Sequence, residues 1–501
     1  MIDPADVNDL QLEDVADYSA DYAEKDFPSA DGNNLQNPEE STDKVHYRRT
    51  RIMALMRANK WFILVVAIVL AVLIGVISAV GGGSKKSSSS SSSGSSSSRS
   101  PVSQPPITVD PKTIDEKVLD ALMVKLIGFY EDNSLEVDNL KDDSLGTTPQ
   151  KQAYWWLASE DGWKNLSDRD LIQRYALASF YYATNSRANA QETSPGPWVD
   201  AYKWLSDEHT CDWKGIVCDP NKEVTAIKMS ENNLSGSLPM ELSLIAATIT
   251  ELDLTTNLIH MEHKMYDVFE SFENLETLLM DDNYLQTYNS GLPWQFKRLV
   301  NIEKIRLSYN LLQGQMESTA KVFEHWGKLT HLEIESNYLT GTMPTEIASL
   351  SNLVYLYMRR NDMTFNLDFL KSDKLVNLFA LWLDNNDITG TIPTEIGNLD
   401  TLVSVSITNS TSLGGPIPSE IGNLSELRRL WLYKNKLTGE IPTQIAKLGK
   451  LEVFEVHNNL LSGDMPDGIC SNVNDADYVN KAVTSDCKTK IGCDCCTQCY
   501  D

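Results

Sequence analysis

The sequence predicts an α/β solenoid, a right-handed horseshoe with a parallel sheet on its concave side, and two observations predict it. First, the pattern LxxLxLxxNxL returns ten times between Val224 and Pro466, at a spacing of 24 to 27 residues. Second, two aliphatic residues alternate within a repeat, as Leu381 and Leu383 do, so both lie on one face of a short strand. A single repeat cannot bury that face, and neighbouring repeats must therefore stack.

The Asn of the pattern follows the strand, where the chain has to turn. Its position is held, in order, by Asn232, Asn257, Asn283, Asn310, Asn337, Asn361, Asn386, Ser410, Asn435 and Asn459. We expect the Asn amide to bond backbone groups that the turn would otherwise leave unpaired.

Six repeats continue with a Gly, a spacer, an apolar residue and Pro. These segments are Gly236 to Pro239, Gly341 to Pro344, Gly390 to Pro393, Gly415 to Pro418, Gly439 to Pro442 and Gly463 to Pro466. The pattern is that of the leucine-rich repeat, and the form NxLTGxIPxxIxxL resembles the plant-type extracellular class. The resemblance covers roughly Leu171 to Pro466, and it implies a receptor-like protein without a kinase domain, of a kind also met in algae.

Composition limits the class of partner and the compartment. The chain has 501 residues, 42% of them apolar, and a net charge of -27. Nucleic acid is excluded as a partner, because phosphate binding needs a basic surface. All eight Cys lie after residue 210, and this grouping indicates disulfides formed in an oxidising compartment.

A run of 20 residues without a charge, Trp61 to Val80, predicts a single transmembrane helix. At about 1.5 Å per residue it covers the roughly 30 Å hydrocarbon core of a bilayer. A cleaved signal peptide is the alternative, but both the run and the segment before it are too long for one. Six basic residues precede the run and three follow it closely, which predicts a cytoplasmic N-terminus and a type II arrangement.

The predicted order of segments follows from these features. It is a disordered acidic cytoplasmic tail with a basic juxtamembrane segment (1–60), the transmembrane helix (61–80), a Ser/Gly/Pro-rich stalk (81–112), a helical region with the N-terminal cap (113–223), ten repeats (224–466) and a Cys-rich C-terminal cap (467–501).

The helical region contains three predicted helices. The first has an apolar face made of Ile114, Val118, Leu119, Leu122, Leu126 and Ile127. The second contains Trp155 and Trp156, and the third follows Ser167, which together with Asp170 is typical of a helix start. Together the three helices would cap the solenoid.

The most specific local motif is PWVDAYKWLSDEHTCDWKGIVC, from Pro197 to Cys218. It resembles the N-terminal capping module of plant-type leucine-rich repeat proteins. That resemblance implies a disulfide between Cys211 and Cys218, and it implies that Trp198, Trp204 and Trp213 pack over the end of the first repeat. An uncapped end would leave a sheet edge and an apolar face in water.

Six further cysteines close the chain. They are Cys470, Cys487, Cys493, Cys495, Cys496 and Cys499. We expect them to form disulfides that staple a C-terminal cap, and a zinc site is the alternative. Six cysteines allow 15 connectivities, and the sequence does not choose between them.

The sequence contains no catalytic motif. It has no G-x-S-x-G, no P-loop, no kinase signature and no HExxH, so we expect neither an enzyme nor a cofactor. Side chains beside the alternating aliphatics should instead point out of the concave face. Those of the later repeats combine aromatic rings with Arg, the composition of binding hot spots. The candidate ligand-binding residues are Tyr355, Tyr357, Arg359, Arg360, Trp382, Arg429, Trp431 and Tyr433.

Two interpretations of these side chains stay open, since neighbours in a ladder can also simply stack on one another. If they bind, the chain is a surface receptor or adhesion protein for a protein, peptide or glycan ligand outside the cell, with a signalling co-receptor as a further partner. Alternatives are a structural wall-associated protein and a membrane-tethered inhibitor of a secreted hydrolase. We expect the plasma membrane as location, with extracellular repeats glycosylated at Asn165, Asn233, Asn409 and Asn423.

Overall fold

The computed structural model describes residues 114–133, 135, 148–160, 163–185, 197–469, 482–487, 491–494 and 496–500. The chain divides into two compact units, Met1–Ser97 and Ser98–Asp501, and every described residue belongs to the second. The predicted tail, membrane span and stalk (1–112) lie outside the described residues. Within the described part, no helix has the length and apolar character needed to cross a membrane.

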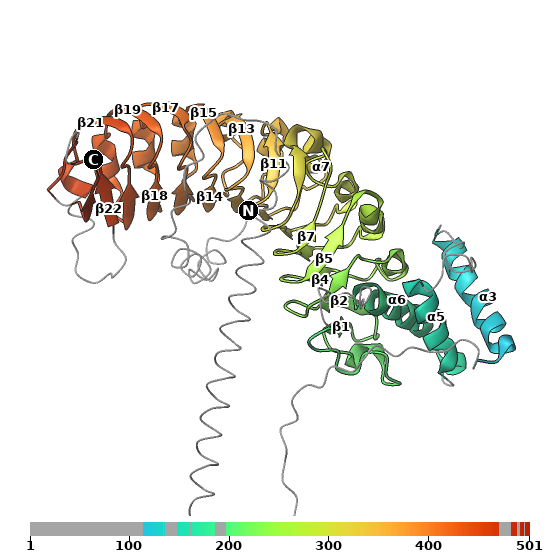
Figure 1. Cartoon of the computed structure of the whole chain (residues 1–501). Coiled ribbons are helices and arrows are strands. Elements are labelled where there is room, and N and C mark those ends of the chain that lie inside the picture. The colour runs from blue at the N-terminus through green and yellow to red at the C-terminus, as the bar shows by residue number, and fades with distance from the viewer. Residues whose placement is uncertain are drawn as a thin grey trace, which may run out of the picture. The chain divides into compact units, whose positions relative to one another are not determined.

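One thirteen-stranded sheet follows the repeats along the concave side of the solenoid (Figure 1). Its strands, in spatial order, are β1 (Ile216–Cys218), β2 (Val224–Lys228), β4 (Glu251–Asp253), β6 (Thr277–Leu279), β8 (Lys304–Arg306), β10 (His331–Glu333), β12 (Tyr355–Tyr357), β14 (Ala380–Trp382), β16 (Ser404–Ser406), β18 (Arg429–Trp431), β20 (Val453–Glu455), β22 (Ala482–Ser485) and β24 (Gln498–Cys499). Strand β1 is antiparallel to β2, and the pairs from β2 onward are parallel. The predicted parallel sheet is confirmed.

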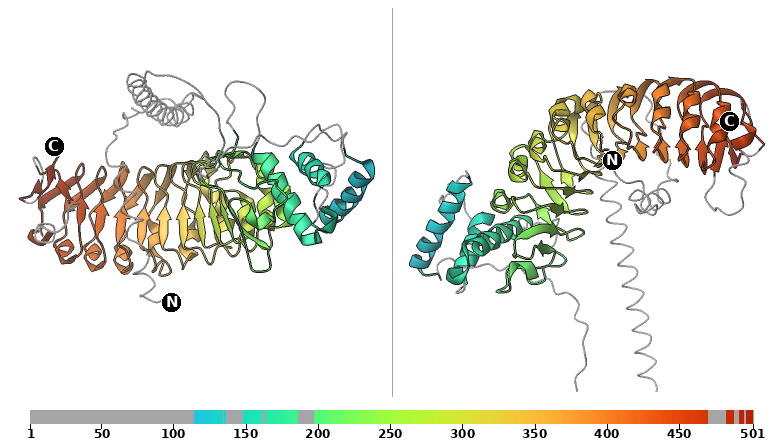
Figure 2. Two further views of the ribbon diagram at one scale, coloured as in Figure 1. Left: turned by 90° about the horizontal axis from the view of Figure 1, so that it is seen from below. Right: turned by 180° about the vertical axis from the view of Figure 1, so that it is seen from behind.

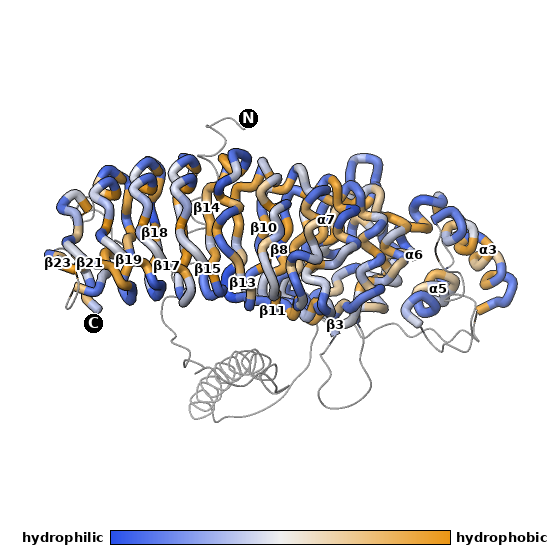
Figure 3. The backbone as a smooth tube through the Cα atoms, turned by 90° about the horizontal axis from the view of Figure 1, so that it is seen from above, coloured by the Kyte–Doolittle hydropathy of each residue, from blue (hydrophilic) through white to orange (hydrophobic). Residues whose placement is uncertain are grey.

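The central aliphatic residue of each strand faces its counterpart in the next repeat. Leu356 pairs with Leu381, and Leu381 with Val405, and all three side chains are fully buried. Burying each one contributes about 1.5 to 3 kcal/mol relative to an exposed side chain. Figure 3 shows the result as hydrophobic stretches that alternate with hydrophilic turns from repeat to repeat.

The Asn column forms a hydrogen-bonded ladder, as predicted. The Nδ2 of Asn310 donates to the carbonyl oxygens of Leu307 in its own repeat and of Met280 in the preceding one, at 3.0 and 2.9 Å. Its Oδ1 accepts from the Leu285 N–H at 3.0 Å. In the eighth repeat, Ser410 keeps part of this function, because its hydroxyl donates to the Asn386 carbonyl.

A second set of strands follows the Asn column, which the sequence analysis did not predict. Strands β3 (Ser235–Gly236), β5 (Leu258–Met261) and β7 (Tyr284–Leu285) form a three-stranded sheet. An eight-stranded sheet contains β9 (Gln313–Gln315), β11 (Tyr338–Gly341), β13 (Asp362–Asn366), β15 (Asp387–Thr391), β17 (Ser412–Gly415), β19 (Lys436–Glu440), β21 (Leu460–Asp464) and β23 (Ile491–Gly492). The nearly regular repeat length explains these sheets, because it brings equivalent extended segments side by side.

Short 3-10 helices complete the turns. Six of them begin directly after a Pro, whose fixed φ suits the entry into a helix. They are η5 (Met240–Leu244), η7 (Trp294–Arg298), η9 (Thr345–Ser349), η11 (Thr394–Asn398), η12 (Ser419–Asn423) and η13 (Thr443–Lys447). The remaining turns contain η6 (His263–Ser271), η8 (Met316–Thr319), α7 (Ala320–Phe323) and η10 (Asp368–Lys371).

The three predicted N-terminal helices are present as α3 (Glu116–Asp132), α5 (Pro149–Ser159) and α6 (Asp168–Thr184), with the short η3 (Trp163–Asn165) between the last two (Figure 2). The hydroxyl of Ser167 accepts a hydrogen bond from the Asp170 N–H and so caps α6. A buried carboxylate links the helices to the first repeat: Glu241 of η5 accepts hydrogen bonds from Tyr130 of α3 and Gln150 of α5.

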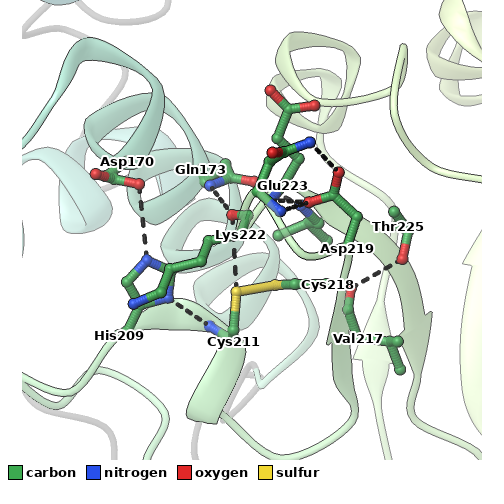
Figure 4. The surroundings of a disulfide bond; sticks show 12 residues. Asp170, Gln173, His209, Cys211, Val217, Cys218, Asp219, Lys222, Glu223 and Thr225 are labelled. Carbon is green, nitrogen blue, oxygen red and sulfur yellow. Dashed lines mark hydrogen bonds and ion pairs between the residues drawn. A yellow bond between two sulfur atoms is a disulfide. The ribbon is translucent and has the colours of Figure 1, made fainter.

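The N-terminal cap has the arrangement that the resemblance implied. Three tryptophans, Trp198, Trp204 and Trp213, are each less than 5% exposed. The ring centroid of Trp204 lies 4.8 Å from that of Trp198 and 5.1 Å from that of Trp213. The disulfide between Cys211 and Cys218 closes the loop through η4 (Thr210–Asp212) onto β1 (Figure 4). The cap therefore covers the apolar end of the solenoid.

Two disulfides staple the C-terminal end, Cys487 to Cys499 and Cys493 to Cys496. Strands β22 and β24 continue the concave sheet there, so the predicted C-terminal cap is an extension of the solenoid. Cys470 and Cys495 lie outside the described residues.

Candidate functional site

The concave face displays three rows of side chains, one residue of each row per repeat. The first row contains Glu251, Thr277, Lys304, His331, Tyr355, Ala380, Ser404, Arg429 and Val453, and the second contains Asp253, Leu279, Arg306, Glu333, Tyr357, Trp382, Ser406, Trp431 and Glu455. The third, two residues beyond the second, contains Asp281, Ser308, Glu335, Arg359, Asp384, Thr408, Tyr433 and His457. Alternation in a strand places the first two rows opposite the core.

Charged groups pair with one another in the middle repeats. Arg306 Nε lies 2.7 Å from Asp281 Oδ2 and 3.4 Å from Glu333 Oε2. Burial raises the pKa of Asp281 to about 6 and that of Glu333 to about 7, although Arg306 acts in the opposite direction on both. Arg359 binds Glu335 through Nε and Nη2, at 2.5 and 3.2 Å.

The predicted ligand-binding aromatic residues of β12 and β14 are packed against their neighbours. Trp382 is 3% exposed and Tyr355 is 8% exposed. The Trp382 ring stacks on Tyr357 with centroids 4.4 Å apart, and its Nε1 donates to the Ser404 hydroxyl at 2.8 Å. The Arg359 guanidinium lies 4.7 Å from the Trp382 ring centroid. Tyr355 and Trp382 therefore follow the alternative interpretation, in which neighbouring side chains of the ladder stack on one another.

The predicted residues of β18 are more open. Arg429, Trp431 and Tyr433 are each half-buried. Burial lowers the pKa of Arg429, while Glu452 acts in the opposite direction. That carboxylate is bound to Arg428 instead, at 2.8 Å. Across the part of the chain that the structure describes, the Arg429 guanidinium forms no hydrogen bond and no ion pair.

Ser406 lies between Trp382 and Trp431 in the second row and leaves no open gap there. It pairs with Trp431 across the strands, and its hydroxyl donates to Asp384 Oδ1. Seven of the eight predicted residues therefore fall into two groups. The predicted residues on β12 and β14, together with Arg359, form a packed ladder. The predicted residues on β18, together with Tyr433 directly after it, form an accessible cationic and aromatic surface. Arg360, half-buried in the turn after Arg359, has the left-handed φ of 56°.

A shallow polar depression of about 510 Å³ lies beside the Asn column, and sequence reasoning missed it. It is lined by Asn361, Asp362, Asn385, Asn386, Asp387, Asn409, Thr411 and Ser412. The sequence did contain a signal for this depression, since the Asn of the pattern is followed by Asp in two successive repeats, at Asn361-Asp362 and Asn386-Asp387. Only the pairing of β13 with β15 and of β15 with β17 brings these residues together.

The model of the Leucine Rich Repeat family matches residues 328–350, 377–399 and 426–448. Keratocan of Danio rerio is 30% identical over 156 residues, which cover 30% of this chain and 42% of keratocan. Serine/threonine-protein kinase BRI1-like 1 of Arabidopsis thaliana is 30% identical over 203 residues, which cover 40% of this chain and 16% of that protein. This chain thus spans less than half the length of either relative.

Among solved structures, the Arabidopsis receptor kinase HAESA, in complex with the peptide hormone IDA and the co-receptor SERK1, aligns with a TM-score of 0.49. The two chains are 22% identical, and the alignment covers 64% of this chain and 54% of that chain.

The stacked repeats, the Asn ladder and the concave parallel sheet together form a leucine-rich repeat solenoid, and the family model matches three of its repeats. Its sequence is similar to part of two Arabidopsis thaliana proteins, Serine/threonine-protein kinase BRI1-like 1 and Receptor-like protein kinase BRI1-like 3.

Proposed function

We propose that this chain is a non-enzymatic, receptor-like or adhesion protein that binds a protein, peptide or glycan ligand on the concave face at β18. One observation carries the proposal. Arg429 is a half-buried guanidinium without a counter-ion in the described structure, whereas Arg306, Arg359 and Arg428 each have one. An unpaired buried cation is unfavourable, and a ligand carboxylate would supply the missing partner.

The surroundings of Arg429 suit a ligand. Trp431 lies two residues further on the same strand, and Tyr433 follows at the turn. Aromatic rings beside Arg are enriched in binding hot spots, because they offer a large contact area at a low cost in conformational entropy. The relatives with receptor kinase names, and HAESA with its bound peptide hormone, are consistent with this class of function.

A capture screen with the full-length protein against extracellular proteins, peptides and glycans tests the proposal. Arg429→Ala and Trp431→Ala should each weaken binding of a captured ligand by more than about 1 kcal/mol, as hot-spot truncations commonly do. Arg428→Ala is the matched control, because that neighbouring arginine already has Glu452 as its partner. A ligand that binds all three variants as tightly as the wild type would contradict the proposed site.

We further propose that residues 61–80 anchor the chain in the plasma membrane, with the repeats outside the cell. The support is the uncharged length of this segment and the excess of basic residues before it. Protease added to intact cells should then digest the repeats and spare the first 40 residues or so. Protected repeats would contradict this topology.

A structural role is the second candidate function, and a specific observation favours it. Between Glu335 and Asp384, concave side chains bind one another through an ion pair, ring stacking and hydrogen bonds. Such a rod could hold extracellular matrix without a specific ligand. The same capture screen separates the two, since a structural rod would yield no ligand whose binding depends on Arg429 and Trp431.

A further inference from the structure

The polar depression beside the Asn column contains none of the residues of the proposed ligand site at β18. Its lining side chains are amides, carboxylates and hydroxyls. Two of them, Asn409 and Thr411, belong to one Asn-x-Thr acceptor sequence for N-linked sugar. The asparagines of the other acceptor sequences, Asn165, Asn233 and Asn423, do not line the depression. One acceptor and the depression therefore form a single surface feature.

The side chain of Asn409 is directed along the solenoid toward the preceding repeat. Asn409 is an exposed residue with a left-handed φ of 54°, and its Nδ2 donates to Asn385 Oδ1 at 2.7 Å. Asn385 holds the same position one repeat earlier and lines the depression. A carboxamide nitrogen carries two hydrogens, so one can remain bonded to Asn385 while a sugar replaces the other. A sugar on Asn409 therefore begins beside the depression.

The depression offers hydrogen-bonding groups that the protein itself does not use. Within the described part of the chain, four exposed side chains of its lining form no hydrogen bond and no ion pair, namely Asp362, Asp387, Thr411 and Ser412. The lining residues follow three successive strands, β12, β14 and β16, and a strand spacing of about 4.8 Å gives the depression a length of roughly 10 Å. Sugar hydroxyl and acetamido N–H groups can donate to the two carboxylates, and sugar oxygens can accept from the two hydroxyls.

We propose that Asn409 carries an N-linked glycan and that the first sugars of this glycan lie in the depression, held by Asp362, Asp387 and Ser412. The inference rests on the proposed placement of the repeats outside the cell, because the sugar is transferred on the lumenal side of the secretory membranes. The donor is an oligosaccharide linked through diphosphate to a lipid. Asn409 Nδ2 loses one proton and bonds C1 of the first N-acetylglucosamine, while the bond from C1 to the diphosphate oxygen breaks and the lipid diphosphate leaves with that electron pair.

Covalent attachment explains why an open, shallow depression is sufficient. A free sugar on such a surface would bind weakly, because each of its hydrogen bonds only replaces one to water. Linkage to Asn409 makes the contact intramolecular, and the short linkage gives the sugar a high effective concentration at the depression. An uncharged glycan also suits two carboxylates on a chain of net charge -27, which repels an anionic ligand.

Site-resolved deglycosylation of the full-length protein, expressed in eukaryotic cells, tests the proposal. N-glycosidase is added to the native protein, and mass spectrometry follows the loss of sugar at each site over time. We expect Asn409 to be occupied and to lose its glycan at least tenfold more slowly than Asn423, which is exposed at the end of η12. After denaturation the two sites should release their glycans at similar rates, because only the folded chain forms the depression.

Two variants connect slow release to the depression. The double variant Asp362→Ala, Asp387→Ala removes two of the three side chains that hold the sugar, so it should speed native release at Asn409 at least threefold and leave release at Asn423 unchanged. Asp400→Ala is the matched control, because Asp400 is an exposed carboxylate outside the depression. Both variants should keep the wild-type melting temperature, since none of these three carboxylates forms a hydrogen bond or an ion pair in the described structure.

An Asn409 without sugar beside a glycosylated Asn423, equal native release at the two sites, or equal release from the double variant and Asp400→Ala would overturn the proposal. Sugar absent from all four acceptor asparagines would remove the proposed location outside the cell as well. Failure of this inference alone leaves the ligand site at Arg429 intact, because capture of a ligand there does not involve the depression.

Discussion

Trp382 stacks on Tyr357 with ring centroids 4.4 Å apart and ring planes 20° apart, and its indole N–H donates to Ser404. Trp382 therefore belongs to the packed structure of the concave face, although it projects on the side of the sheet opposite the core.

The first prediction is that Trp382→Ala destabilises the fold. Truncation of buried tryptophans in cores costs roughly 3 to 5 kcal/mol, and we expect a loss near the lower end, about 3 kcal/mol, because the concave packing is thinner than a core. Denaturant unfolding measures it. Trp431→Ala, the half-buried control at the equivalent position, should lower stability by less than about 1 kcal/mol. Equal losses of stability in the two variants would show that the difference in burial between the two rings does not affect stability.

The second prediction concerns the Asn ladder. Asn310→Ala removes donors to Met280, Leu307 and Ser308 carbonyls and the acceptor of the Leu285 N–H. At about 1 kcal/mol for each hydrogen bond, we expect a loss of roughly 3 kcal/mol or more, measured by denaturant unfolding. Asn301→Ala, at a half-buried position with weaker, solvent-facing bonds to Glu273, Asn274 and Lys328, should cost less than half as much. A smaller loss of stability in Asn310→Ala would show that water replaces the hydrogen bonds of the Asn310 side chain.

The third prediction is a pH dependence of stability. The folded-state pKa values of Asp281 and Glu333, about 6 and about 7, lie above their unfolded values, so the folded state binds more protons. Their contribution is present at low pH and is lost as the pH rises through those values. The lowered pKa of His331 acts in the opposite direction, but only below about pH 6.5.

Between pH 6.5 and 8 the melting temperature of the wild type should therefore fall more than that of the double variant Asp281→Asn, Glu333→Gln. Thermal unfolding in matched ionic strength measures the difference. Parallel curves for the two proteins would contradict the raised pKa values.

The fourth prediction is that thiol titration of the denatured, unreduced protein finds nearly no free cysteine. Three disulfides, Cys211 to Cys218, Cys487 to Cys499 and Cys493 to Cys496, account for every described cysteine. Cys470 and Cys495 are the pair that remains, and we expect them to be joined. Two reactive thiols would show that this last bond is absent, and four or more together with bound zinc would favour the alternative metal site.

The fifth prediction concerns glycan occupancy. Asn423 is exposed on η12, whereas Asn233 is half-buried and its Nδ2 donates to the Pro197 carbonyl at 3.0 Å. Native protein should carry N-linked sugar at Asn423 more completely than at Asn233, as mapped by mass spectrometry after N-glycosidase treatment. Sugar-free Asn165, Asn409 and Asn423 would contradict an address outside the cell.

The sequence by itself determined the repeat length, the buried aliphatic residues, the Asn ladder and the composition of the N-terminal cap. These features are local, because each repeat carries its own strand pattern and its own turn residue. The pairing of Leu356 with Leu381, and of Leu381 with Val405, follows from the nearly regular spacing of the pattern. The second sheet could have been expected on the same ground, since equal repeats bring any extended segment beside its copy.

Only the tertiary structure decided which outward side chains remain accessible. Trp382 and Trp431 occupy the same position of the repeat, yet Trp382 is buried and Trp431 is half-buried. The cause lies in the neighbouring strands: Tyr357 precedes Trp382 and Arg359 covers it, whereas Ser406 precedes Trp431 and Glu455 follows it. Burial on a solenoid face depends on residues about 25 positions away in the chain, and a pattern within one repeat does not contain them.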